Sequence, residues 1–231
     1  MGRLREPRAS AGKGRSHERF PGVVELDDRR VATRNLAPGS RVYGETVLGV
    51  GEDELRVWDP RRSKLAAAIL KGVRTFPLGP RTNVLYLGAA NGTTASHVSD
   101  VCRQAAVWCV EFSPRAFRDL LNVCYKRPNM VPILADVARP ETYAALVGRV
   151  DTLYMDVAQR DQAGLFLRNV RAFAPAHAML AVKSRSIDVA REPAEVFKEV
   201  RAPLQQEVDV LEIVRLEPFE EDHAMAIVRR R

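Results

Sequence analysis

The pattern of apolar positions changes along the chain and divides it into three segments. Residues 1–19 contain few apolar side chains, which is typical of a disordered tail. Residues 20–58 carry short apolar runs separated by turn residues, a pattern that predicts a small antiparallel β module. The β-type runs of this module are 23–26, 31–33, 42–43 and 54–58. The module holds no cluster of acid and base residues, so we interpret it as a docking or packing element.

Residues 59–231 alternate runs of strand and helix character and are predicted to form one larger domain. Asp59 and Pro60 favour a helix over 61–71, because Asp caps helices and Pro is accepted at their first position. Further strands are expected at 84–87, 106–110, 131–134, 150–155, 178–182, 208–216 and 225–228. Further helices are expected at 94–102, 114–125, 142–147, 162–173 and 194–204.

The order of these elements predicts an α/β fold with a Rossmann-like parallel sheet of seven strands. The last two strands are joined by a short loop around residue 218, which favours an antiparallel hairpin and makes the last strand antiparallel. Five crossover strands followed by such a hairpin resemble the order of class I AdoMet-dependent methyltransferases.

The segment 84–111 has the pattern of one half of a nucleotide-binding crevice. A short apolar strand leads into the small-residue turn Gly88-Ala-Ala-Asn-Gly92, a helix follows, and a second strand ends at Glu111. The carboxylate of Glu111 is placed where a ribose diol needs an acceptor. The strict G-x-G-x-x-G pattern is absent, so an ordinary α/β crossover whose glycines serve only the turn is the alternative.

Polar or aromatic residues follow the end of strand after strand in the predicted sheet. In open α/β sheets ligands bind outside the carboxyl ends of the strands, so these residues are expected to share one rim. They are Glu111, Phe112, Asp136, Asp156, Gln159 and Lys183, with His223 just before the last strand. Any one of them alone is explained as a cap or a solvated strand end, whereas their recurrence on one rim favours a site.

Charge and composition narrow the classes of partner. The net charge is +7, and residues 1–19 alone hold six Lys/Arg against two Asp/Glu. A basic tail suggests a polyanionic partner, with a merely solubilising tail as the alternative. Aromatic content of 6% is low for a surface that reads bases by stacking, so RNA contacts through backbone and shape are expected. The chain has no apolar run near the roughly 20 residues that cross a bilayer, and we expect no membrane partner. The cysteines and histidines lack the spacing of a metal site.

Several segments, in the same order, resemble the fibrillarin family from about residue 20 to the end of the chain. They are W-D-P-R-R-S-K-L-A-A-A-I-L at 58–70, V-L-Y-L-G-A-A-N-G-T-T-A-S-H-V-S-D at 84–100, V-E-F-S-P-R at 110–115, M-D-V-A-Q-R-D-Q-A at 155–163 and E-P-F-E-E-D-H-A-M at 217–225. The resemblance implies an AdoMet-dependent RNA ribose 2′-O-methyltransferase, the catalytic subunit of a box C/D guide ribonucleoprotein that acts on rRNA, with tRNA as a second candidate substrate. Implied partners are guide RNA, target RNA, a Nop-domain scaffold protein and a kink-turn-binding protein.

The chain departs from the family pattern at two points. It has a short basic tail where eukaryotic members carry a long Gly/Arg-rich domain, so it resembles the archaeal form, which implies a cytoplasmic location. Asn91 stands where the family often has serine, a small polar exchange that should leave the turn intact.

The resemblance also implies a catalytic set of Lys64, Asp156, Lys183 and His223. Lys183 is our candidate base, because a lysine that is partly desolvated beside another cation is expected to have a lowered pKa. Asp156 is expected to orient Lys183, while Lys64 and His223 are expected to position the ribose or stabilise the developing alkoxide.

For the cofactor, the resemblance implies that the turn after the first strand approaches the methionine end of AdoMet. Glu111 is expected to hold the ribose, Phe112 to lie against the adenine, and Asp136 to accept from the adenine amino group. The complete implied set is Gly88, Ala89, Ala90, Gly92, Thr93, Thr94, Glu111, Phe112, Asp136, Val137, Asp156 and Gln159. The alternatives are a class I methyltransferase that acts on protein or a small molecule, and a non-catalytic RNA-binding subunit of the same fold.

Overall fold

The structure is a computed structural model that describes residues 17–26 and 29–231. Residues 1–16 of the predicted basic tail lie outside this described part. Residues 17–19, which the sequence pattern also assigned to the tail, belong to the first strand, β1 (His17–Phe20). The β module therefore begins a few residues before the predicted boundary.

The N-terminal module is an antiparallel sheet with the strand order β1-β2-β3-β5-β4 in the described residues. Its other strands are β2 (Val23–Glu25), β3 (Val31–Arg34), β4 (Val47–Val50) and β5 (Asp53–Trp58). The predicted strand at 42–43 is wrong. Those residues form a turn in which the carboxylate of Glu45 accepts the backbone N–H groups of Val42 and Tyr43. Strand β4 went unpredicted because its Gly49 belongs to a Gly-x-Gly pattern that indicated a turn.

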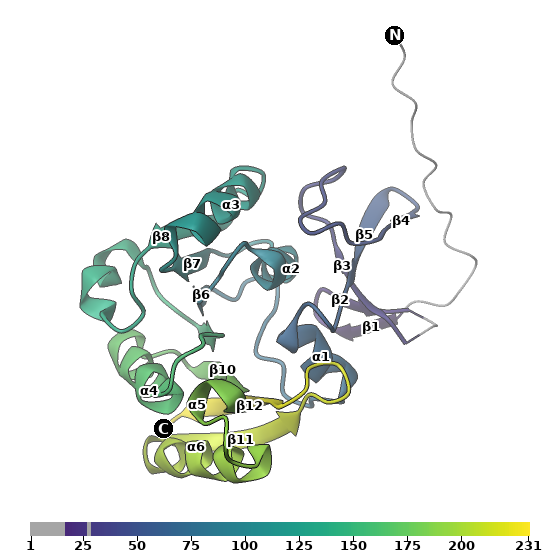
Figure 1. The fold of residues 1–231 in the computed structure, drawn as a ribbon. Coiled ribbons are helices and arrows are strands. Elements are labelled where there is room, and N and C mark those ends of the chain that lie inside the picture. The colour runs from purple at the N-terminus through teal and green to yellow at the C-terminus, as the bar shows by residue number, and fades with distance from the viewer. Residues whose placement is uncertain (1–16, 27–28) are drawn as a thin grey trace.

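The larger domain contains a seven-stranded sheet with the order β11-β12-β10-β9-β6-β7-β8 within the described residues (Figure 1). The strands β10, β9, β6, β7 and β8 run parallel, while β12 is antiparallel to both of its neighbours. The predicted class I methyltransferase fold is confirmed. The strands are β6 (Val84–Leu87), β7 (Val107–Glu111), β8 (Met130–Leu134), β9 (Thr152–Met155), β10 (His177–Lys183), β11 (Val208–Arg215) and β12 (His223–Arg230).

Helices cover both faces of this sheet, because successive strand residues point to opposite sides. One apolar cluster joins α1, α2 and α3 to the face that carries Tyr86 and Met179, and the other joins α4 and α6 to the face that carries Leu85 and Leu180. The helices are α1 (Lys64–Leu70), α2 (Thr93–Val101), α3 (Pro114–Tyr125), α4 (Gln162–Phe173), α5 (Ser184–Ile187) and α6 (Pro193–Glu207).

Two predicted helices differ from the structure. Helix α1 begins at Lys64 with Ser63 as its N-cap, not at residue 61, because Asp59 instead closes a turn by accepting the N–H of Arg61. The helix predicted at 142–147 is wrong. This part of the chain forms two 3₁₀ turns, Pro140–Thr142 and Ala144–Leu146. The side chain of Tyr143, between the two turns, is buried.

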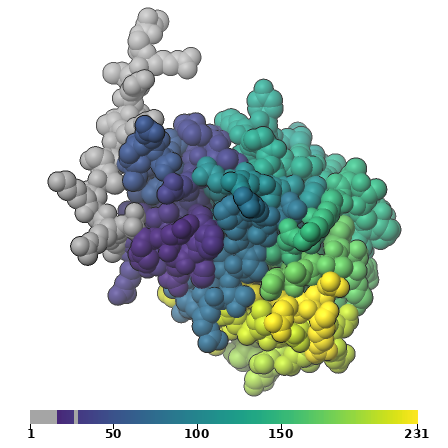
Figure 2. All heavy atoms as spheres, turned by 180° about the vertical axis from the view of Figure 1, so that it is seen from behind, coloured from purple at the N-terminus to yellow at the C-terminus, as the bar shows by residue number. Residues whose placement is uncertain are grey.

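A buried network of charges joins the N-terminal module to α2. Arg56 of β5 donates to Glu45 over 2.6 Å and to Asp100 of α2 over 2.8 Å, and Asp100 also pairs with Arg127. Beside them His97 is fully buried, and its pKa lies well below the usual value because of burial first and the charges of Arg56 and Arg127 next. The module is thus fixed in place, and seen from behind the purple module lies directly against the larger domain (Figure 2).

Candidate active site

The structure brings the four predicted catalytic side chains together at the carboxyl ends of the strands. Asp156 follows β9, Lys183 is the last residue of β10, and His223 opens β12 directly opposite Lys183. Lys64, the first residue of α1, reaches the same place from the other side. The Nζ of Lys183 lies 2.8 Å from Oδ1 of Asp156, and the Nζ of Lys64 lies 3.4 Å from Oδ2.

The Asp156 carboxylate lies between two ammonium groups in a largely desolvated setting. The side chains of Lys64, Asp156 and Lys183 are 14%, 15% and 18% exposed. The contact to Lys64 has hydrogen-bond geometry, whereas the closer contact to Lys183 is an ion pair whose alignment does not meet that of a hydrogen bond. The carboxylate of Asp156 therefore holds both ammonium groups. The partly exposed side of each ammonium group can meet a substrate.

The His223 ring has a lowered pKa and a defined orientation. Burial lowers its pKa from the usual value, the charge of Lys64 lowers it further, and the carbonyl of Glu221 together with the carboxylates of Glu220 and Asp156 offsets part of the shift. Its Nδ1 lies 2.5 Å from the carbonyl oxygen of Glu221. Because a carbonyl only accepts, Nδ1 carries a proton, and in the neutral ring that the lowered pKa favours Nε2 is left as an acceptor.

Three residues that sequence reasoning missed support this arrangement. Gln162 accepts the backbone N–H of Lys183 and donates to the carbonyl of Val157, which ties β10 to the loop after β9. Ser63 accepts from Thr94 and so joins the start of α1 to α2. Glu220 lies 4.0 Å from the Lys64 ammonium and 3.8 Å from Nδ1 of His223. All three residues lie within segments that resemble the family, which was the available signal.

The turn between β6 and α2 needs its first glycine. Gly88 has φ +81°, and a Cβ there would lie 2.6 Å from the carbonyl oxygen of Asp156. This close approach of β6 and β9 sets Asp156 beside the turn. Gly92, the N-cap of α2, has φ +86° and offers no side chain to the helix end. The first N–H groups of α2 are thus left for an anion, such as the carboxylate of an amino acid.

Glu111 is held rigidly at the end of β7. Its Oε2 accepts the N–H of Ala90 over 2.8 Å, and its Oε1 accepts the N–H of Ser113 over 2.7 Å. A carboxylate has about four acceptor positions, so two remain for hydroxyl groups. The next residue, Phe112, has a side chain that is 70% exposed and has room for a flat ring against it. These features fit the ribose and adenine of AdoMet.

Asp136, Val137 and Gln159, three further predicted cofactor residues, differ in how they can meet a ligand. One carboxylate oxygen of Asp136 accepts the N–H of Ala138, and the other has capacity for an amino group. The side chain of Val137 is buried in the apolar core, so that only its backbone can meet a ligand. Gln159 is exposed on the loop after β9, and the glutamine that ties this loop is Gln162. The cofactor roles of these residues stay predictions.

A family model described as Fibrillarin matches residues 15–231. The chain belongs to the fibrillarin family. A fibrillarin-like rRNA/tRNA 2′-O-methyltransferase of Thermococcus gammatolerans is 50% identical over 219 residues, which are 92% of this chain and 97% of the relative. Within the described residues, no set of three or more His, Cys, Asp or Glu side chains is placed to hold a metal ion. In the same part of the chain, no helix is long and apolar enough to cross a membrane.

Two solved fibrillarin structures share this fold. Aeropyrum pernix fibrillarin in complex with natively bound S-adenosyl-L-methionine aligns with a TM-score of 0.84 and 46% identity, over 94% of this chain and 98% of that one. The fibrillarin chain of a fibrillarin/Nop5p complex aligns with a TM-score of 0.83 and 36% identity, over 91% of this chain and 98% of that one.

Proposed function

We propose that this chain is an AdoMet-dependent RNA ribose 2′-O-methyltransferase and the catalytic subunit of a box C/D guide ribonucleoprotein. The observation that carries the proposal is the carboxylate of Asp156 between the ammonium groups of Lys64 and Lys183, with His223 beside them at the cofactor rim. A small-molecule methyltransferase has no need of two lysines at the methyl-transfer position. The name of the Thermococcus relative and the ligand of the Aeropyrum structure support the same activity.

We assign cofactor binding to the rim described above. When bound, AdoMet supplies an electrophilic methyl group on a sulfonium centre. The free N–H groups at the start of α2 hold its carboxylate, Glu111 accepts from its ribose hydroxyls, and Phe112 lies against its adenine. Asp136 accepts from the adenine amino group. The carboxylate of Asp156 adds negative charge where the sulfonium needs it.

The ribose 2′-hydroxyl must lose its proton as it attacks, and we assign Lys183 as the proton acceptor. The Lys183 ammonium first gives a proton to solvent, and its Nζ then takes the proton of the 2′-hydroxyl, which restores the ammonium that pairs with Asp156 at 2.8 Å. Lys64 stays cationic and stabilises the negative charge that develops on the 2′-oxygen. The unprotonated Nε2 of His223 is placed to accept a hydrogen bond from a ribose hydroxyl and so to orient the sugar.

We propose a Nop-domain scaffold protein as the direct protein partner, in line with the fibrillarin/Nop5p complex. Guide RNA, target RNA and a kink-turn-binding protein complete the proposed assembly, and target choice is left to base pairing. The close relative is archaeal, and we accordingly propose a cytoplasmic location in an archaeal-type cell.

The test is transfer of labelled methyl from AdoMet to target RNA in the assembled complex, with the modified position mapped. We expect methylation at one guide-selected 2′-hydroxyl, and its loss in an Asp156→Ala protein and in a Lys183→Ala protein that still binds AdoMet. Lys198→Ala, which removes an exposed lysine of α6, is the matched control. Transfer to protein or to a small molecule in place of RNA would refute the proposal, and near-normal turnover of Lys183→Ala would refute the base assignment alone.

A further inference from the structure

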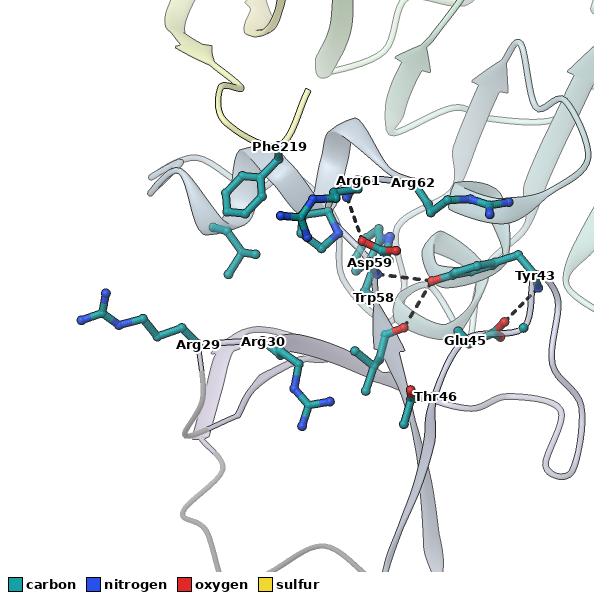
Figure 3. A pocket seen from close by; sticks show the side chains of 14 residues that line it. Arg29, Arg30, Tyr43, Glu45, Thr46, Trp58, Asp59, Arg61, Arg62 and Phe219 are labelled. Carbon is teal, nitrogen blue, oxygen red and sulfur yellow. Dashed lines mark hydrogen bonds between the residues drawn. The ribbon is translucent and has the colours of Figure 1, made fainter. Parts of the chain in front are cut away.

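A pocket of about 680 Å³ lies between the N-terminal module and α1 (Figure 3). Its size is that of sites that hold small ligands, and it would accept one nucleotide unit of a polymer. Three aromatic residues, Tyr43, Trp58 and Phe219, line it, and Phe219 points into it from the loop between β11 and β12. Four arginines also line it: Arg29 and Arg30 before β3, and Arg61 and Arg62 before α1.

The pocket carries a net positive charge, because its four arginines outnumber the carboxylates of Glu45 and Asp59. Glu45 pairs with the buried Arg56, and Asp59 accepts the backbone N–H of Arg61. Within residues 17–26 and 29–231, the guanidinium groups of Arg61 and Arg62 have no carboxylate at ion-pair distance, and both side chains are exposed. The guanidinium of Arg62 lies 5.5 Å from the ring centroid of Tyr43, an arrangement that holds it at the pocket wall.

Two chain segments contribute residues both to the pocket and to the surroundings of the catalytic set. Arg62 and Lys64 are separated only by the helix cap, so one lines the pocket while the other contacts Asp156. Phe219 is followed directly by Glu220, which lies 4.0 Å from Lys64. The pocket and the catalytic set thus share neighbouring residues of the chain, as is required if a polymer with its reacting unit at the catalytic set is to place an adjoining unit in this pocket.

We propose that the pocket binds the nucleotide next to the methylated one on the target RNA strand, a statement that rests on the function proposed above. Arg61 and Arg62 take its phosphate, because the guanidinium fork matches phosphate oxygens in a bidentate way. Phe219 stacks on its base, a contact that every base can make. Such a site reads no sequence, which suits an enzyme whose target is chosen by guide pairing.

The first test is the steady-state kinetics of Arg61→Gln/Arg62→Gln in the assembled complex. We expect the KM for target RNA to rise about tenfold, because two charge contacts from exposed side chains are lost and each contributes roughly threefold, with kcat and the Kd for AdoMet unchanged. The dependence of log KM on log salt concentration should fall by about 1 to 2 in slope. The matched control is Arg103→Gln/Arg149→Gln, which removes two exposed arginines near the amino ends of the strands.

The second test is photocrosslinking with target RNAs that carry 4-thiouridine at single positions around the methylated nucleotide. We expect a crosslink to Phe219 or Tyr43 only from the adjacent nucleotide, and its loss in Phe219→Leu, which keeps apolar bulk without the ring. Crosslinking needs no methyl transfer, so it tests the pocket even if the wild-type complex proves inactive on RNA, which would refute only the proposed function.

Two results would overturn the pocket assignment. One is a KM for the double variant equal to that of its control, with crosslinks mapping elsewhere. The other is a loss of binding to the scaffold protein in the absence of RNA, which would assign the pocket to a protein segment.

Discussion

Replacement of Glu111 by Gln is the most informative perturbation of the cofactor site, because the amide is usually taken as a mild substitute for a carboxylate. In this chain both carboxylate oxygens accept backbone N–H groups, one from Ala90 and one from Ser113. A glutamine has one acceptor oxygen and one NH₂ group. In either orientation of the amide, its NH₂ group faces one of the two backbone N–H groups, and two donors form no hydrogen bond.

Two measurable effects follow. In the free protein, one backbone N–H loses its acceptor near a side chain that is 9% exposed, so the free energy of unfolding should fall by about 1–3 kcal/mol. On binding, AdoMet loses a charged acceptor for its ribose hydroxyls. Hydrogen bonds to charged groups contribute about 1.5–3 kcal/mol, so the Kd should rise roughly 10- to 150-fold.

Calorimetric titration with AdoMet measures the Kd, and denaturation by guanidinium chloride measures stability. Glu111→Ala should weaken binding to a similar extent, since neither variant supplies the carboxylate. Glu52→Gln is the control, because Glu52 is exposed in the turn between β4 and β5 of the N-terminal module. A Glu111→Gln protein with a Kd within about twofold of the wild type would refute the assignment of Glu111 to the ribose.

Three further predictions concern the turn, the buried network and the pH response. Gly88→Ala should reduce kcat at least about tenfold in a folded protein, because the new Cβ displaces Asp156; an unchanged kcat contradicts this. Asp100→Ala leaves the buried Arg127 without its carboxylate and removes one of the two that pair with Arg56, so it should lower the free energy of unfolding by about 3–5 kcal/mol in denaturant titration, against less than about 1 kcal/mol for loss of the exposed Arg34–Asp53 pair. The lowered pKa of His97 means that the unfolded chain binds a proton near pH 6.5 that the folded chain refuses, so stability is complete above that pH and falls below it. The Tm should accordingly drop between about pH 7.5 and about pH 5.5, and less so in His97→Gln.

The parallel strands were predictable because both of their faces are buried, which leaves short continuous apolar runs in the sequence. The predicted ends of these strands were correct within about two residues. The candidate catalytic and cofactor residues lie at the carboxyl ends of the strands. The elements that failed depend on contacts outside their own segment. Residues 42–43 form a turn because Glu45 binds their N–H groups, and the start of α1 at Lys64 depends on Ser63, which is also tied to Thr94 of α2.

The functional site also contains residues that the local pattern predicts and residues whose role depends on contacts outside their own segment. Glu111 and Lys183 were predicted as rim residues because they follow apolar runs, and they are the last residues of β7 and β10. Gln162 was predicted only as the first residue of a helix, yet its amide bridges Lys183 and the loop after β9. No local pattern distinguishes a capping glutamine from a bridging one, since the difference lies in what packs opposite.

By itself, the sequence determined the order of the elements and the rim on which the polar residues stand. The physical reason is that burial imposes the apolar periodicity and the βαβ connection imposes the direction of the strands. Only the tertiary structure decided that Lys64 and Lys183 share the carboxylate of Asp156, and that Tyr43, Arg62 and Phe219 line one pocket. These residues are far apart along the chain, and their separations depend on how α1 and the N-terminal module pack against the sheet.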